Sequence, residues 1–304
     1  MVVTVLALAA LAVLLLGPAP AALARARWVS GEPRAALVLW QALGLAAGLA
    51  AVGGMLALGV APLGGDLPAA LAAWGRGVAG GDPSGGLRLG HSMLLGAALG
   101  LLGWLLAVTW LSAWRTWRSR NRHRDLVDLV STPWRAGSSA RVIDHPAAAA
   151  YCLPGHDARV VVTTGALGLL DDDELDAVLA HEQAHLAERH DLVILPFTAW
   201  ASALPWLLGP RRAREAVQGL VEMVADDRAC VGRERRVLAA ALARVGAAAA
   251  PAGSVGSTEH ALLARVRRLL DPPGRSGPAR GAAYLGAVAL LALPTVALLV
   301  PALL

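Results

Sequence analysis

The chain has 304 residues, of which 56% are hydrophobic, and its formal net charge is +5 at pH 7. The positive charge is not accompanied by a nucleic-acid-binding motif or by interleaved aromatic residues, so no nucleic-acid partner is expected. The two cysteines, Cys152 and Cys230, lack C-x-x-C spacing. We therefore interpret both as small buried apolar residues, without a redox or metal role.

Four apolar stretches are long enough to cross a lipid bilayer, at residues 2–24, 35–63, 93–114 and 282–304. The first stretch precedes an Ala-rich sequence, as a secretory signal would, but no basic segment stands in front of it. Arg25 and Arg27 come after the apolar run instead. We therefore expect four membrane helices, with the first one uncleaved.

Charge asymmetry predicts how these helices are oriented in the membrane. Arginines gather after the first and third stretches, at Arg25, Arg27 and Arg34 and at Arg115, Arg118, Arg120, Arg122 and Arg124. The connection 64–92 is Gly-rich and nearly balanced in charge. By the positive-inside rule, the N-terminus lies outside, and residues 115–281 form a cytoplasmic domain before the fourth helix.

The cytoplasmic segment begins with short runs that have the composition of β-strands. The runs at 141–144 and 159–164 predict two strands, and 147–153 predicts a third, ended by Pro154 and Gly155. A helix should follow, because Asp171 and Glu174 have the spacing of a capping box. Its apolar positions recur at helical spacing, at Leu175, Val178, Leu179 and Leu186.

This predicted helix contains the motif H-E-x-x-H, as His181-Glu182-Gln183-Ala184-His185. Residues four apart share a helix face, so both imidazoles can reach one metal ion, and Glu182 stands beside them as a general base. The alternative is a chance occurrence on an ordinary amphipathic helix. The capping box, the apolar stripe and an acidic segment downstream argue against chance.

The third metal ligand is expected further along the chain. Glu222 is our candidate, because a carboxylate beside two imidazoles leaves a fourth position open, as catalytic zinc sites require. Asp226 lies one turn later and would orient one of the histidines. Glu215 is the competing carboxylate, but no acid follows it at the same offset. His190 is one residue too early for a metzincin ligand.

Two further segments leave alternatives open. Residues 192–209 are uncharged and apolar, and they separate the two halves of the expected metal site. They form either a membrane-associated hairpin beside the site or a buried helix of the soluble domain, since a single crossing would put Glu222 on the wrong side. Residues 259–270 have helical periodicity, and we interpret their Arg265, Arg267 and Arg268 as a solvated or headgroup-facing surface.

The motif helix, the segment Ala149–Gly155 and the segment Val160–Leu167 resemble the BlaR/MecR-type membrane metallopeptidases. The HtpX and CaaX-prenyl endopeptidase group is similar in the same motifs, including E-x-x-x-D at Glu222–Asp226. The resemblance implies zinc ligands at His181, His185 and Glu222, a general base at Glu182, and a substrate that lies along a sheet edge. Either 147–153 or 159–163 would provide that edge.

The resemblance implies a multi-pass α-helical membrane protein with a cytoplasmic α+β gluzincin-like zinc metallopeptidase domain. No S-x-x-K element occurs on an outer segment and the chain stops at Leu304, so direct beta-lactam sensing is not expected. We predict a zinc-dependent endopeptidase in the cell membrane that cleaves a cytoplasmic regulator or membrane protein in signal transduction. The alternatives are an HtpX-type quality-control protease and a non-catalytic signalling or scaffold protein.

Overall fold

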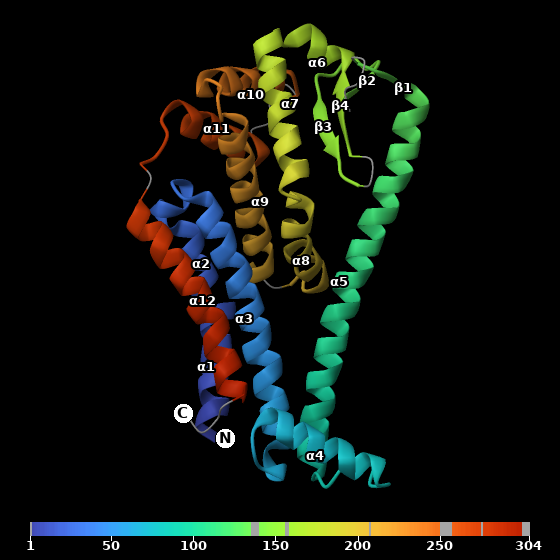
Figure 1. The fold of residues 1–304 in the computed structure, drawn as a ribbon, viewed down its shortest axis with the longest axis vertical. Coiled ribbons are helices and arrows are strands. Elements are labelled where there is room, and N and C mark those ends of the chain that lie inside the picture. The colour runs from blue at the N-terminus through green and yellow to red at the C-terminus, as the bar shows by residue number, and fades with distance from the viewer. Residues whose placement is uncertain are drawn as a thin grey trace.

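A computed structural model describes residues 2–134, 140–155, 158–206, 208–249, 257–274 and 276–299. Long apolar helices run along one end of the molecule, and a small sheet surrounded by shorter helices occupies the other end (Figure 1). We refer to the described residues of 131–187 and 235–270 as the sheet region.

Among the described residues, three helices are long and apolar enough to cross a membrane. They are α3 (Pro33–Val60) with the short 3-10 turn η2 (Ala61–Leu63), α5 (Leu89–Val130) and α12 (Gly277–Leu299). The predicted first span is divided into α1 (Val2–Leu16) and α2 (Pro18–Arg25), bent by 40°. The bend falls at Gly17 and Pro18, because proline lacks the N–H that would continue the helix ladder. Residues 300–304 of the predicted last span lie outside the described residues.

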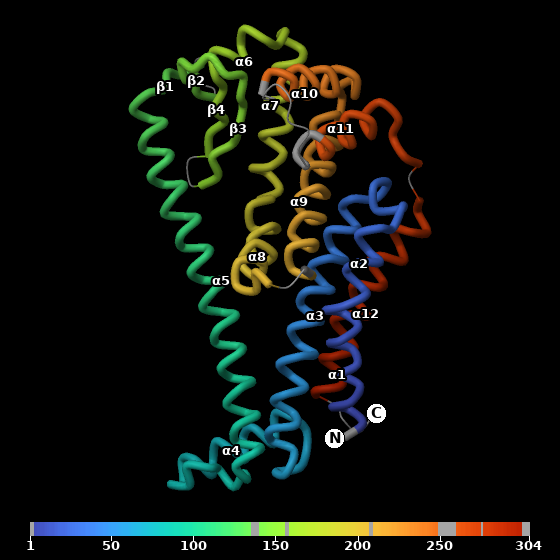
Figure 2. The backbone as a smooth tube through the Cα atoms, turned by 180° about the vertical axis from the view of Figure 1, so that it is seen from behind, coloured from blue at the N-terminus to red at the C-terminus, as the bar shows by residue number. Residues whose placement is uncertain are grey.

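The ends of these helices are sorted along the long axis of the molecule. The start of α1 and the end of α12 lie at the same end as α4 (Leu67–Ala79), and the sheet region lies at the other (Figures 1 and 2). The turn η1 (Arg27–Ser30) leads from α2 into α3. Helix α5 does not stop where its apolar stretch stops. It continues to Val130, and the first strand of the sheet begins at the next residue, Ser131.

The sheet has four strands in the order β1-β2-β4-β3. They are β1 (Ser131–Pro133), β2 (Ala140–Ile143), β3 (Ala150–Leu153) and β4 (Arg159–Thr163). The three predicted strands are confirmed, whereas β1 was not predicted. β2 and β4 are parallel, and the other pairs are antiparallel. β3 therefore lies at an edge of the sheet, and β4 lies inside it.

In the described part of the chain, six helices lie between the sheet and α12. They are α6 (Thr164–Leu169), α7 (Asp172–Ala187), α8 (His190–Ala203), α9 (Leu208–Ala229), α10 (Arg235–Ala249) and α11 (Ser257–Leu270). α7 and α10 bury their apolar stripes against one face of the sheet, where Val160 and Val162 are fully enclosed. Each such buried side chain contributes roughly 1.5–3 kcal/mol.

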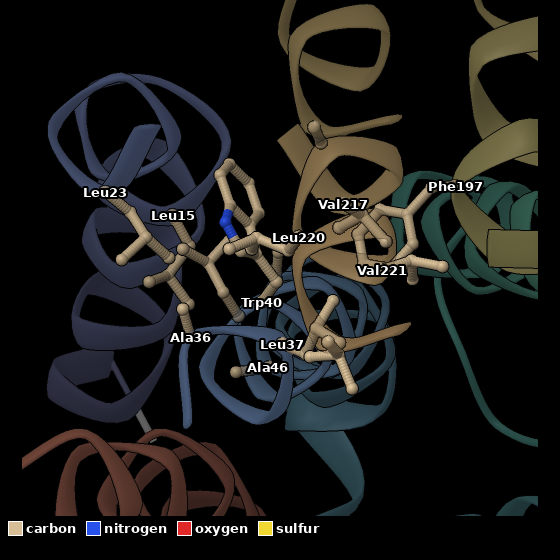
Figure 3. Close-up of a cluster of buried hydrophobic side chains, with 14 residues drawn as sticks. Leu15, Leu23, Ala36, Leu37, Trp40, Ala46, Phe197, Val217, Leu220 and Val221 are labelled. Atoms are coloured by element: carbon tan, nitrogen blue, oxygen red, sulfur yellow. The ribbon is translucent and has the colours of Figure 1, made fainter. Parts of the chain in front are cut away.

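Helices α8 and α9 form a hairpin that runs toward the long helices and returns (Figures 1 and 2). The hairpin packs on α3 through a buried cluster that includes Trp40, Phe197, Val217 and Val221 (Figure 3). The Trp40 and Phe197 rings meet edge to face at 6.5 Å. The segment predicted at 192–209 is thus the first arm and turn of a helical hairpin beside the apolar helices, apart from residue 207, which lies outside the described residues.

Candidate active site

Helix α7 presents the H-E-x-x-H motif, and its predicted start is confirmed. The Asp171 side chain accepts a hydrogen bond from the Glu174 backbone at 2.9 Å, and the Glu174 side chain accepts one from the Asp171 backbone at 3.1 Å. Leu175, Val178 and Leu179 are buried against the sheet. His181 and His185 lie on the adjoining face of α7, one and two turns after Val178, and this face packs toward α9.

The α8–α9 hairpin brings Glu222 back to both histidines. His181 Nε2 and His185 Nε2 lie 3.1 Å apart. The Glu222 carboxylate lies 3.5 Å from His181 Nε2 and 3.6 Å from His185 Nε2. One ligand atom from each of the three residues falls within 4.8 Å of the others. Two imidazole nitrogens and one carboxylate oxygen are a donor set that zinc accepts, so these side chains fit a zinc ion.

Asp226 lies behind His181 on the same face of α9 as Glu222. Its Oδ1 atom is 3.0 Å from Nδ1 of His181, the nitrogen that points away from Glu222, and the residue is 1% exposed. Burial alone would raise the pKa of Asp226, but hydrogen bonds from Arg265 outweigh it and lower the pKa to about 2. Asp226 is therefore a carboxylate that can fix the ring orientation of His181.

Arg265 is a site residue that we had interpreted as part of a solvated surface, and that interpretation is wrong. Its guanidinium donates to both oxygens of Asp226, at 2.9 and 2.6 Å, and lies 2.8 Å from Glu222. Arg268 is likewise enclosed and pairs with Asp227 at 2.7 Å. Among these three arginines, Arg267 keeps the exposed position expected of it.

His190 contacts the other side of His185. The Nδ1 atoms of the two rings are 3.0 Å apart, and His190 is 3% exposed. It is not part of the three-residue ligand group. Through this contact His190 can hold the Nδ1 side of the His185 ring, which points away from Glu222. Asp226 can hold the Nδ1 side of His181 in the same way.

The pKa values of the two histidines of the motif are shifted in opposite directions. Burial lowers the pKa of His181, but contacts with the carboxylates of Asp226 and Glu222 outweigh it and raise the pKa to about 9. Burial and the neighbouring His181 lower the pKa of His185 to about 4. The carboxylates of Asp226 and Glu222 thus favour positive charge at His181, at the place where a metal cation would supply it.

Glu182 points to the edge strand β3. Burial raises the pKa of Glu182, as suits a carboxylate that must exchange protons near neutral pH. It contacts the backbone and the thiol of Cys152 in β3. Burial, with Glu182 as neighbour, raises the pKa of Cys152 to about 12, so the thiol stays neutral. Cys152 and Cys230 are both free.

A cavity of about 140 Å³ opens beside Glu182 and His181. Its wall is largely aliphatic and comes from β3, α6, α7 and α10, with Ala150, Ala166, Leu170, Val178, Leu238, Leu242 and Val245. The cavity is large enough for one apolar side chain of medium size. Its position next to the candidate base makes it a natural subsite for a bound ligand.

Comparison with known proteins assigns this region to a class. Residues 116–224 match the family model of Peptidase family M48. The matched stretch contains the whole sheet, His181, Glu182, His185 and Glu222, and ends before Asp226. On this match the protein is a metallopeptidase. No curated protein and no solved structure gives a significant match.

Proposed function

We propose that the protein is a zinc-dependent endopeptidase anchored in the membrane. The observation that supports this proposal most is the convergence of His181, His185 and Glu222 on one point, with Glu182 on the same helix as the two histidines. These three residues would hold the zinc ion. When bound, zinc would polarise the scissile carbonyl and the attacking water.

The side chains of the chain would carry the proton transfers. Glu182 would take a proton from the attacking water and give it to the leaving amine, a task that its raised pKa favours. Asp226 and His190 would hold the rings of His181 and His185 so that their Nε2 atoms face each other. Arg265 would keep Asp226 ionised and Glu222 in place.

The substrate would bind as an added strand on β3. In this antiparallel pair, the Ala149 carbonyl accepts from Thr163 N at 3.0 Å, so residues 150 and 152 direct their backbone groups away from β4. That free edge borders Glu182. Of the two strands predicted to receive substrate, β3 has the free edge and β4 does not. An apolar side chain of the bound peptide would enter the cavity beside Glu182.

The membrane arrangement is also a proposal. The three long apolar helices and the bent pair α1–α2 would form four spans, with residues 115–281 cytoplasmic. The common placement of α4, the start of α1 and the end of α12 supports an even number of crossings (Figure 1), and the arginines after Trp114 support the cytoplasmic side. The substrate would be a cytoplasmic regulator, as in the BlaR/MecR-type signalling proteases, or a membrane protein, as in HtpX-type quality control.

Substitution of the base tests the catalytic proposal against the scaffold alternative. Glu182→Gln should retain zinc and lose about 10²–10⁴-fold in cleavage of casein or of itself, because an amide cannot accept the proton. Zinc content and cleavage are measured on the same purified protein. Equal cleavage by wild type and variant would refute the mechanism, and a wild type that binds no zinc and cleaves nothing would favour a scaffold.

A further inference from the structure

A second cavity, of about 320 Å³, lies where α3 and α12 begin and α9 ends. It shares no lining residue with the cavity beside Glu182. Its charged and aromatic lining consists of Glu32, Arg34, Asp227, Arg228, Arg280 and Tyr284. The cavity therefore joins the polar ends of two apolar helices to the helix that carries Glu222.

The acidic groups of this cavity are already engaged. Asp227 accepts from Arg268 at 2.7 and 3.1 Å and from Arg235 at 3.1 Å. Glu32 is 8% exposed and accepts a hydrogen bond from Ser276 N at 3.1 Å. Two arginines compensate the charge of Asp227, so within the described residues Glu32 is the acid of this cavity whose charge has no cationic partner.

The basic groups are engaged only in part. Arg34 pairs with Glu188 at 2.5 Å. Arg228 and Arg280 are exposed, and within the described residues neither forms an ion pair. Two guanidinium groups on different helices, α9 and α12, thus border one cavity without an anionic partner. Guanidinium forks of this kind match the oxygens of a phosphate group.

The location of the cavity favours a phospholipid headgroup as the anion. Arg280 stands just before the apolar stretch of α12 and Tyr284 stands near its start, where arginine and tyrosine face lipid headgroups in membrane proteins. Leu285 and Val288 follow on α12 and are 73% and 65% exposed, so an acyl chain can lie along them. Helix α3 also begins here, and its N-terminus adds positive potential.

We propose that this cavity binds the phosphate-bearing headgroup of an anionic phospholipid, held by Arg228 and Arg280. We call it the headgroup cavity. The lipid would connect α12 to the end of α9, within two turns of Glu222 and Asp226. Bound lipid would then restrain the helix that supplies these two carboxylates to the metal centre.

Lipid binding by the whole chain tests the proposal, and proteolysis does not have to be measured. The protein is reconstituted in phosphatidylcholine nanodiscs, and bound phosphatidylglycerol is counted by native mass spectrometry as its fraction is raised. Arg228→Gln and Arg280→Gln should each weaken retention of phosphatidylglycerol roughly tenfold, and the double variant roughly 100-fold, from the loss of one charged hydrogen-bonding group each. Arg280→Lys should recover part of the loss.

Arg115→Gln is the matched control, because Arg115 is an exposed arginine after the apolar stretch of α5 and does not line the headgroup cavity. It should leave retention unchanged. Each variant must keep the wild-type unfolding temperature in pure phosphatidylcholine, so that a loss of lipid is not a loss of fold. Equal retention by the double variant, or an equal loss in Arg115→Gln, would overturn the proposal.

The source of the phosphate group is tested by competition. Millimolar inorganic phosphate or glycerol phosphate should fail to displace phosphatidylglycerol, since neither gains from the apolar surface of α12. Displacement by inorganic phosphate at concentrations equal to those of the lipid would reassign the cavity to a soluble phosphate and overturn the lipid proposal. None of these measurements reads zinc binding or proteolysis. A failure of the lipid proposal would therefore leave the metallopeptidase proposal intact.

Discussion

Glu222 is the one ligand that α9 contributes to the group of three, so its removal should affect the metal most. Glu222→Ala should lose zinc at chelator concentrations that wild type withstands, because two imidazoles remain. Asp226→Ala should weaken zinc about 10–100-fold, since it disturbs only the orientation of His181. Metal content after dialysis against a graded chelator measures both effects.

Glu215 provides the control for this series. It lies on the same helix, two turns before Glu222, but its side chain is exposed. Glu215→Ala should therefore leave metal content unchanged. A result in which Glu215→Ala strips the metal and Glu222→Ala does not would show that we have chosen the wrong carboxylate.

Spacing along the chain could predict the site residues that share one helix face, namely those of α7 and those of α9. H-E-x-x-H and E-x-x-x-D each place two side chains on one helix face, so the sequence was enough to propose them. Arg265 depends on a contact with α9, which no local pattern encodes. A signal was nevertheless present, because Leu262, Arg265 and Leu269 share one face of α11, and Leu269 is buried. An arginine on an apolar face requires a carboxylate partner.

The free edge of β3 gives a prediction at the scale of one element. Ala150→Pro removes an N–H that points away from β4, and edge strands tolerate proline there. The variant should fold and keep zinc, yet cleave peptides about tenfold more slowly, because one hydrogen bond to the substrate strand is lost. Cleavage rate and unfolding temperature are measured together.

Tyr151→Pro is the contrasting variant, because Tyr151 pairs with Val161 inside the sheet. It should destabilise the protein by about 1–3 kcal/mol through an unsatisfied buried group. If Ala150→Pro cleaves as fast as wild type while Tyr151→Pro unfolds, the substrate does not add to β3.

Elements with a strong pattern were predicted close to their observed bounds. β4 and α7 combine a dense apolar run with clear end signals, and both occur where expected. β1 was missed because it has only three residues and includes Pro133. It exists through pairing with β2, a tertiary effect that propensity does not contain. The length of α5 was also not predicted, because an arginine-rich segment is compatible with both a helix and a loop.

The orientation of the whole molecule gives a prediction about access from outside the cell. With Cys152 and Cys230 removed, a cysteine at Ser119, exposed on the far part of α5, should resist an impermeant thiol reagent in intact cells. A cysteine at Gly90, at the other end of α5, should react, because a side chain added there would meet no atom of another element within 4 Å of its Cβ. Reversed labelling of the two positions would invert the proposed topology.

The architecture as a whole was only partly accessible from the sequence. Hydropathy identified the apolar helices, because length and composition suffice for that. Residues 192–209 were predicted to form either a membrane-associated hairpin or a buried helix, since an apolar stretch of borderline length does not reveal its own path. Its course follows from packing against Trp40 and its neighbours on α3, which are far away in the chain (Figure 3).

The hairpin has a thermodynamic consequence. His185 stands before it and Glu222 after it, so an ion bound to both would act as a cross-link between distant points of the chain. Closing a loop of roughly 40 residues removes conformational entropy from the unfolded chain worth about 4 kcal/mol. We therefore expect stripped protein to melt at a lower temperature than loaded protein. The stripped hairpin should also exchange its amide hydrogens faster, while the sheet, which lies outside the loop, stays protected.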